Sequence, residues 1–228
     1  MKLRGAAQGS LALIAEVIVG GLADHLGLPV PARRVLFLSA DPPTDDHNDE
    51  LADLLARSVG ENLGFRLLER ARDPRPEEIA SAPIDFASQV RWLDWLTLNP
   101  DRTPANPNLL REGAHWWLID HGAALPFQHD WSAVTEQSPG RAGPPIPHLL
   151  DQRASRLAAW DPLLTSLLSR EDLSAILALV PDSFLQPTVP DPQSRGQLDR
   201  RRAAYVAFLW KRLQGPRDSL LSLAAAHP

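Results

Sequence analysis

The chain contains no cysteine among its 228 residues, which excludes disulfides and thiolate metal sites. It also lacks an apolar run of the roughly 18 residues that a membrane-spanning helix requires, so we expect no membrane association. The apolar stretch 11–19 is interrupted by Glu16 and no small-residue cleavage site follows it cleanly, which favours a buried helix over a signal peptide. A chain without cysteine is compatible with a reducing compartment, and we expect a cytoplasmic protein.

The chain also lacks a basic excess, since its formal net charge is -5, and direct nucleic-acid binding is therefore not expected. What it does contain is typical of a soluble globular protein, with 44% hydrophobic and 22% charged residues. Its length suffices for one large domain or two small lobes with a substantial core. Proline, at 22 residues, has about twice its usual share of about 5%, which predicts many stiff turns.

The segment 99–122, NPDRTPANPNLLREGAHWWLIDHG, predicts a β-hairpin with polar, turn-rich ends. Its first strand is expected at 108–110 and its returning strand at 115–119. The turn at 111–114 has Gly113 at its centre. This hairpin is the element around which we expect the rest of the chain to be organised.

A regular hairpin about Gly113 places Leu110 opposite Trp116 and Asn106 opposite Asp120, with paired Cβ atoms about 5 Å apart. An amide oxygen and a carboxylate at that spacing would form an oxygen-only cation site, which Mg²⁺ prefers when phosphates supply further ligands. Asp101, five residues before Asn106, would be placed to point a further carboxylate at an incoming hydroxyl.

The order of these motifs resembles that of a known family. Asp-x-x-x-x-Asn, a hairpin and Ile-Asp-x-Gly are similar to the catalytic loop and metal-binding motif of protein-kinase-like folds. The chain resembles the HipA-like kinases over nearly its whole length. The segments that carry this resemblance are DRTPANPNLL, WLIDHGAAL and, near the start, KLRGAAQG and ALIAEVIVGGLADHLGLPVP. The resemblance implies ATP- and Mg²⁺-dependent phosphotransfer to an unidentified protein or small-molecule acceptor.

The resemblance also implies an α+β, kinase-like two-lobed fold. We expect a small, truncated N-lobe over 1–75 and a mostly helical C-lobe over 76–228, which carries the catalytic-loop hairpin. Kinases place two strands and a phosphate-covering Gly-rich loop before the lysine that corresponds to Lys2, whereas this chain begins one residue before it. Either the start lies further upstream, or the chain is a truncated form, or the protein is a degenerate kinase that acts as a nucleotide- or protein-binding module.

Residue by residue, the resemblance assigns roles in the catalytic segment. Asp120 and Asn106 would hold Mg²⁺, and Asp101 would orient the acceptor hydroxyl and take its proton. Arg102 would add positive charge near the transferred group. The alternative for the segment 101–104 is an ordinary Asp-capped turn.

Two residues near the start complete the implied nucleotide site. Glu16 is a lone carboxylate in an apolar helix, and such a group needs a cationic partner or water. The resemblance implies that Lys2 is this cationic partner and that Lys2 also binds the nucleotide phosphates. The alternative is a glutamate at the helix rim, facing solvent.

A different class of function is a metal-dependent hydrolase. Asp120, His121 and His129 include two histidines and a carboxylate, a set that can bind Zn²⁺ or Fe²⁺. The acidic run 45–50 would also suit a metal, but its ligands are sequential and precede a helical pattern, which favours an acidic helix start.

The remaining pattern predicts mostly helices. Ser10 would cap a helix over 11–26, and Arg200–Arg202 would form a solvated face of the last helix. The residues 132–148 form a Ser/Pro/Gly-rich loop where a kinase has its activation segment. The other expected elements are strands at 35–38 and 64–68 and helices at 84–98, 151–160, 161–169, 170–179 and 197–214.

Overall fold

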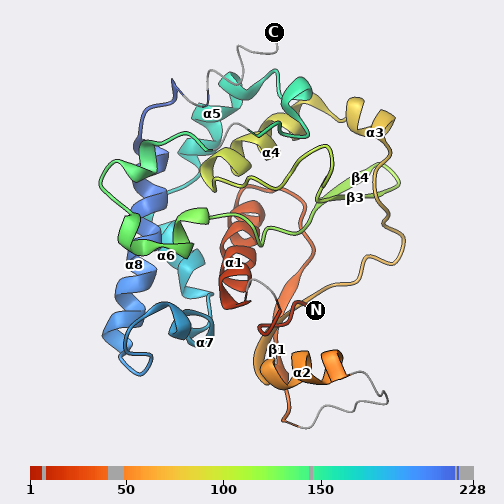
Figure 1. The fold of residues 1–228 in the computed structure, drawn as a ribbon. Coiled ribbons are helices and arrows are strands. Elements are labelled where there is room, and N and C mark those ends of the chain that lie inside the picture. Colours follow the sequence, from red (N-terminus) through yellow and green to blue (C-terminus); the bar gives the residue numbers. More distant parts are fainter. Residues whose placement is uncertain (7–8, 41–48, 144–145, 219, 221–228) are drawn as a thin grey trace.

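A long apolar helix, α1 (Gly9–His25), occupies the centre of the molecule (Figure 1). The computed structural model describes residues 1–6, 9–40, 49–143, 146–218 and 220. Every residue of α1 from Leu13 to Ala23 is buried, including Glu16, so the helix is covered on all sides. It ends before Gly27, whose φ of 72° is a conformation that glycine adopts without strain.

Helices from the C-terminal part of the chain cover α1. The helices α6 (Arg170–Ala178) and α7 (Asp182–Leu185) pack directly on it, and α8 (Arg195–Gln214) packs on α6. Ile176 of α6 lies so close to Gly21 that a Cβ there would be 2.8 Å from its Cγ2. One hydrophobic cluster therefore includes residues from both ends of the chain.

The two sheets in the described residues are both two-stranded and antiparallel. The first pairs β1 (Arg33–Leu38) with β2 (Gly60–Phe65), and α2 (Asp49–Arg57) lies between them in the sequence. Lys2 forms an isolated antiparallel bridge to β2 on the side away from β1. The strand predicted at 64–68 begins and ends earlier than expected, because the backbone pairs from Gly60.

The second sheet is the predicted hairpin, formed by β3 (Leu109–Glu112) and β4 (His115–Leu118). Its register differs from the prediction by one residue, since Leu110 pairs with Trp117 rather than with Trp116. The turn consists of two residues rather than four, and its first residue is a glycine with φ of 60°, which suits a tight hairpin turn. The register therefore does not place Asn106 opposite Asp120.

The predicted helices are largely present, with shifted ends. The helix α4 (Ile84–Leu96) and the helix α5 (Leu157–Ser166) pack on each other. Two separate helices were predicted on either side of residue 160, but α5 continues through that point and contains Pro162. The shorter elements are α3 (Pro76–Ala80) and the 3₁₀ turns Pro126–His129, Trp131–Ala133, Ser138–Gly140, Asp151–Arg153 and Gln186–Thr188.

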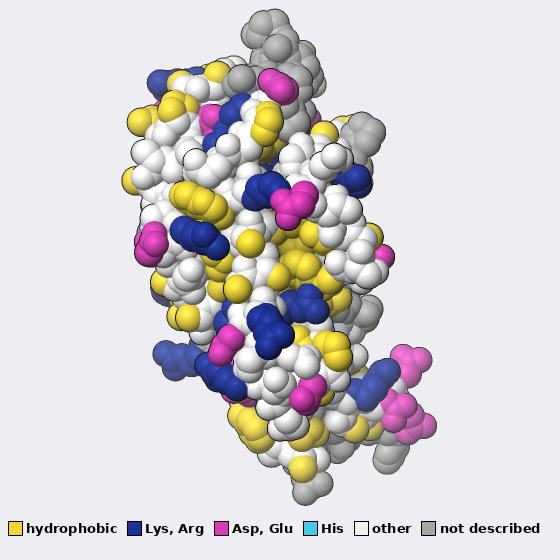
Figure 2. All heavy atoms as spheres, turned by 90° about the vertical axis from the view of Figure 1, so that its left-hand side faces the viewer, with side chains coloured by type: hydrophobic (Ala, Val, Ile, Leu, Met, Phe, Trp, Pro, Cys, Tyr) yellow, Lys and Arg dark blue, Asp and Glu magenta, His cyan; other side chains and the backbone are white. Residues whose placement is uncertain are grey.

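The prediction that Arg200–Arg202 forms a merely solvated face is wrong for two of its members. The guanidinium of Arg201 lies 4.6 Å from the ring centroid of Trp131, and Arg202 donates to the carboxylate of Asp182 at 2.5 Å. These contacts tie α8 to neighbouring segments. Figure 2 shows this side of the molecule, where cationic and apolar side chains lie next to one another.

The fold class is mixed α and β, as expected, whereas the division into lobes at 75/76 stays a prediction. The hydrophobic cluster contains both α1 and the C-terminal helices, so the core is continuous across that position. The acidic run is described only from Asp49, where α2 begins with two acidic residues; residues 45–48 lie outside the described chain. None of the described helices has the length and apolarity to cross a membrane.

Shortening a side chain in the centre of α1 is expected to destabilise the whole molecule. Leu22 is fully buried, and Leu22→Ala should lower the free energy of unfolding by about 2–5 kcal/mol, because it removes apolar contacts and leaves a cavity. Leu179→Ala is the matched control, since Leu179 is 62% exposed and its truncation should change stability by less than about 0.5 kcal/mol. Urea unfolding of both variants measures this. Equal effects would contradict the central position of α1.

Candidate functional site

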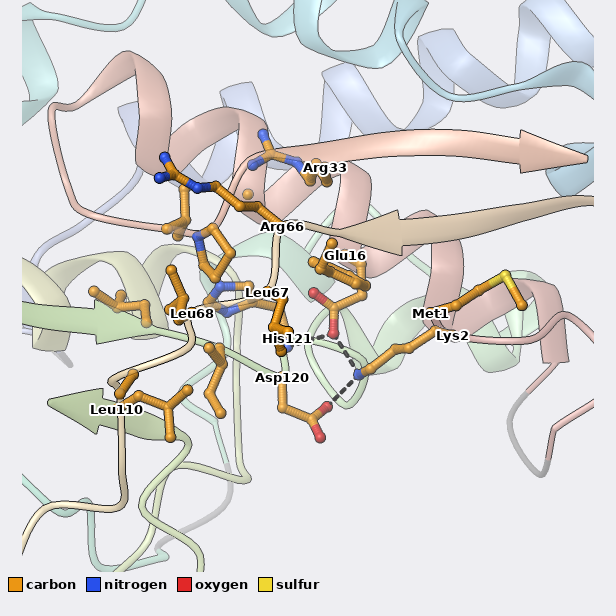
Figure 3. Close-up of a pocket in the computed structure, with 17 residues that line it drawn as sticks. Met1, Lys2, Glu16, Arg33, Arg66, Leu67, Leu68, Leu110, Asp120 and His121 are labelled. Carbon is orange, nitrogen blue, oxygen red and sulfur yellow. Dashed lines mark hydrogen bonds and ion pairs between the residues drawn. The ribbon is translucent and has the colours of Figure 1, made fainter. Parts of the chain in front are cut away.

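Lys2 lies where the N-terminal segment, α1 and the end of β4 meet. Its backbone exchanges two hydrogen bonds with Leu63 of β2, at 2.7 and 3.2 Å, which fix its position although it is the second residue. Its ammonium donates to Glu16 Oε1 and to Asp120 Oδ1, each at 2.5 Å (Figure 3). Burial opposes charge on Lys2, but the two carboxylates outweigh it and hold the pKa of the ammonium above its usual value.

Glu16 is the buried partner of this pair. It is 1% exposed, so the expected ion pair with Lys2 is present and the rim alternative is wrong. Burial raises the pKa of the Glu16 carboxyl, against the effect of Lys2. Its Oε1 also accepts the backbone N–H of His121 at 2.8 Å, and this bond holds the chain that follows β4 against α1.

Asp120 stands at the turn that follows β4. Its φ of 53° lies in the left-handed region, which is uncommon outside glycine and is enriched at functional sites. The side chain is half exposed, and in the described part of the molecule only its Oδ1 has a hydrogen-bond donor. Its second carboxylate oxygen therefore has free lone pairs.

Asp101 is held by two asparagines of the loop between α4 and β3. Its Oδ2 accepts from the side-chain amides of Asn106 at 2.8 Å and Asn108 at 2.9 Å. Its own N–H donates to Asn99 Oδ1 at 3.1 Å. Both amides bind the same oxygen, Oδ2. The other oxygen, Oδ1, takes part in no hydrogen bond between described residues.

Asn106 is an exposed residue that the structure joins to Asp101 rather than to Asp120. Its amide nitrogen faces Asp101, which leaves the amide oxygen without a donor among the described residues. This oxygen and the carboxylates of Asp120 and Asp101 are hard oxygen donors of the kind that suits Mg²⁺. The observed register of β3 and β4 does not place Asn106 opposite Asp120, so a cation site shared by these two residues stays a prediction.

Arg102 does not face the site, contrary to the expectation that it adds charge near a transferred group. Its side chain is completely buried and donates to Asp94 Oδ2 at 2.6 Å and to the backbone carbonyl of Asn108. Burial opposes charge on Asp94, but Arg102 and His148 hold the pKa of that carboxyl well below its usual range. Arg102 therefore supports the loop from behind.

Two adjoining cavities meet at Lys2 and Asp120. The first has a volume of about 600 Å³ and largely apolar walls, formed by residues such as Val30, Phe65, Leu68, Leu110 and Leu118. The second, of about 490 Å³, is lined by Asp101, by the start of α1 and by Leu54. Met1, Lys2 and Asp120 line both cavities. The charged centre, formed by Lys2, Glu16 and Asp120, therefore lies between the first, apolar cavity and the second cavity, which Asp101 lines.

Sequence reasoning missed several residues of this site. Asp94 is a carboxylate flanked on both sides by apolar residues in the run Trp92–Leu96, a signal similar to the one that singled out Glu16, and it could have been found in that way. Asn108 follows Asn106 by two residues, and the hairpin pattern predicts only that it begins a strand. The apolar walls of the first cavity come from segments distant in the sequence, and no local pattern brings them together.

The two histidines that a metal-dependent hydrolase would use lie in different surroundings. His121 is buried whereas His129 is exposed on the turn that follows. Among the described residues, no group of three or more His, Asp or Glu side chains is arranged to hold a metal ion. Asp120, His121 and His129 therefore do not form a metal site.

The buried histidines predict acid sensitivity. Burial lowers the pKa of His148 below its ordinary 6.5 against the effect of Asp94, and burial lowers the pKa of His121 to about 3. The His148 ring is neutral when Nδ1 accepts the N–H of Leu150 and Nε2 donates to Asp94.

Below pH 6.5 the unfolded chain binds protons that the folded chain does not, so stability should fall on acidification, by at most about 1.4 kcal/mol per pH unit for each histidine. Urea unfolding between pH 7 and 4.5 measures the slope. His148→Gln should reduce that slope, whereas His129→Gln, at an exposed position, should leave it unchanged. Identical slopes in all three proteins would contradict the neutral state of His148.

The comparisons with known proteins give a family match. The model of the HipA-like kinase family matches residues 2–139. No curated protein and no solved structure matches the chain. Because the family match covers more than half of the chain and contains the charged centre and both cavities' polar residues, the chain belongs to the HipA-like kinases, a family of kinase-like phosphotransferases.

Proposed function

We propose that the protein binds ATP with Mg²⁺ and transfers the terminal phosphoryl group to a hydroxyl acceptor. The observation that carries this proposal is the position of the Lys2 ammonium between Glu16 and Asp120, at the junction of the two cavities. A cation in that place can pair with phosphate oxygens while the base lies in the apolar chamber.

The apolar cavity suits a nucleobase. Its volume of about 600 Å³ lies within the range typical of ligand pockets, and its walls are mostly aliphatic. The backbone segment from Arg66 to Leu68 borders it, and the hydrogen bonds between described residues engage no N–H of Leu67 or Leu68. These groups would be available to the polar edge of a base.

Asp120 and Asn106 carry the oxygens that would hold a magnesium ion. Asp120 would supply its free carboxylate oxygen, and Asn106 would supply its amide oxygen from the neighbouring loop. When bound, the ion would neutralise charge on the phosphates. Lys2 would contribute a second positive charge, held in place by the buried Glu16 carboxylate.

Asp101 would act on the acceptor. Asp101 lines the second cavity, and Asn106 and Asn108 fix its carboxylate by Oδ2, while no hydrogen bond between described residues engages Oδ1. A carboxylate held in this way can accept the proton of an incoming hydroxyl and orient its oxygen. Arg102 and Asp94 would support this geometry indirectly, as positioning residues.

The metal-binding role of Asp120 predicts a loss of magnesium-dependent nucleotide binding. ATP with Mg²⁺ at 100 times its dissociation constant should stabilise the wild type by about 2.7 kcal/mol, and Asp120→Ala should remove this gain. Asp199→Ala on α8 is the matched control and should respond like the wild type, since Asp199 lies outside both cavities. Thermal unfolding with ATP, with Mg²⁺ and with both gives the measurement. A wild type that ignores all three additions would refute the proposal.

The role of Asp101 predicts that binding and transfer can be separated. Asp101→Asn should reduce phosphoryl transfer to the protein itself or to water by about 10²–10⁴-fold, because the general base is lost, while ATP affinity stays within about threefold. Radiolabelled ATP measures transfer, and calorimetry measures affinity. If the wild type binds ATP without any transfer, the protein is a nucleotide-binding module instead of an enzyme.

A further inference from the structure

The strand β1 leaves the backbone groups of one edge unpaired among the described residues. Leu63 of β2 exchanges both of its backbone hydrogen bonds with Lys2, so it forms none with Val35, which lies opposite it. Because bonded and non-bonded pairs alternate along an antiparallel ladder, the N–H and C=O groups of Arg33, Val35 and Phe37 point away from β2. No hydrogen bond outside the ladder engages these groups in the part of the chain that the structure describes.

The side chains along this edge are apolar and exposed. Val35, Leu36 and Phe37 all face solvent, and Phe37 is 76% exposed, whereas the part of β2 opposite them is buried. Edge strands of native proteins are usually protected from other chains by charges, by proline or by a covering element. An apolar edge with outward-pointing backbone groups is instead the arrangement that accepts an added strand.

Two unpaired cations lie on the outer face of the same sheet. Arg34 lies opposite Gly64, and Arg66 follows Gly64 by two residues, so both arginines face the same side, about 7–8 Å apart in a regular sheet. Neither forms an ion pair with a described acidic residue, whereas Arg33 is paired with Asp24 at 2.7 Å. Because like charges at this spacing repel each other, the pair favours an anionic neighbour.

A hollow of about 370 Å³ lies beside these arginines. Arg34, Arg66 and Leu36 line it, and no acidic residue does. Leu36 lies across Gly64, since a Cβ on this glycine would be 2.4 Å from Leu36 Cδ1. Figure 3 shows Arg33 and Arg66 where β1 begins and β2 ends. The hollow therefore combines accessible positive charge with an apolar side chain, next to the free edge of β1.

We propose that the free edge of β1 and this hollow bind an extended acidic segment of a partner protein. The segment adds a strand whose backbone pairs with Arg33, Val35 and Phe37. Its acidic side chains face Arg34 and the hollow, and its apolar side chains, on the other face of the added strand, pack on Val35 and Phe37. The charge of β1 argues against a second copy as the occupant, because the strand contains two arginines and no acid, and two such strands side by side would add like charges.

Nuclear magnetic resonance of the full chain tests the surface with a defined probe. The probe is a peptide of about the length of β1 in which glutamate and valine alternate, added at up to about 1 mM so that weak binding is detected. It should shift the amide resonances of Val35 and Phe37 and slow their hydrogen exchange. A peptide of equal length that alternates lysine and valine should leave both unchanged. Unshifted resonances with the acidic peptide would overturn the proposal.

A charge reversal and a backbone change test the two kinds of contact separately. Arg34→Glu should weaken binding of the acidic peptide by more than about tenfold, because it replaces a charged hydrogen bond with repulsion. Arg200→Glu, the same change at an exposed position of α8, is the matched control and should bind like the wild type. An acidic peptide whose amides are methylated cannot pair with the edge and should not bind. Equal binding by Arg34→Glu, or by the methylated peptide, would contradict the proposed contacts.

Two further measurements identify other occupants. A single-stranded oligothymidylate that shifts the same amides and depends on Arg34 would overturn the proposal in favour of a nucleic acid. A wild type that sediments as a dimer, and that Phe37→Glu converts to a monomer, would overturn it in favour of a second copy. None of these measurements uses ATP, so a failure of the proposed phosphotransfer would leave their results unchanged.

Discussion

The structure depends on one contact, the ammonium of Lys2 between the carboxylates of Glu16 and Asp120. It connects three parts of the chain that no local interaction would bring together: the N-terminal segment beside β2, the central helix α1, and the end of the hairpin. A buried carboxylate without a cation would be costly, and two carboxylates so close would repel each other. The lysine removes both penalties at once, so the loss of its charge would disturb the fold and the site together.

Backbone strain is concentrated in the same region. Leu98, Asn108, Asp120 and Leu125 are the non-glycine residues with positive φ in the described chain, and all lie in or beside the segment that carries the acidic and amide groups. Such conformations persist only where surrounding contacts hold them, and here the buried Asp94–Arg102 pair supports the loop from behind. The strain and the support together hold Asp101 and Asp120 on one cavity wall.

Local patterns predicted the elements that carry the site, but not how these elements meet. The hairpin, the long helix and the buried Glu16 follow from turn residues, apolar spacing and the cost of an isolated charge. The predicted hairpin register was wrong because a glycine suits both a two-residue and a four-residue turn. Which of the two turns forms is decided by the packing of side chains across the strands. Arg102 was misplaced because its partner Asp94 lies on another element. The cavity walls depend on distant segments, which no pattern in the sequence relates.

The burial of α1 against α6 and α7 has a mechanical consequence. The helix that carries Glu16 is part of the main helical body and cannot tilt without opening its buried contacts with α6 and α7. Because Lys2 joins β2 to this helix through its backbone and its ammonium, the charged centre keeps its place with the helical body, and a bound ligand would meet it as a rigid wall.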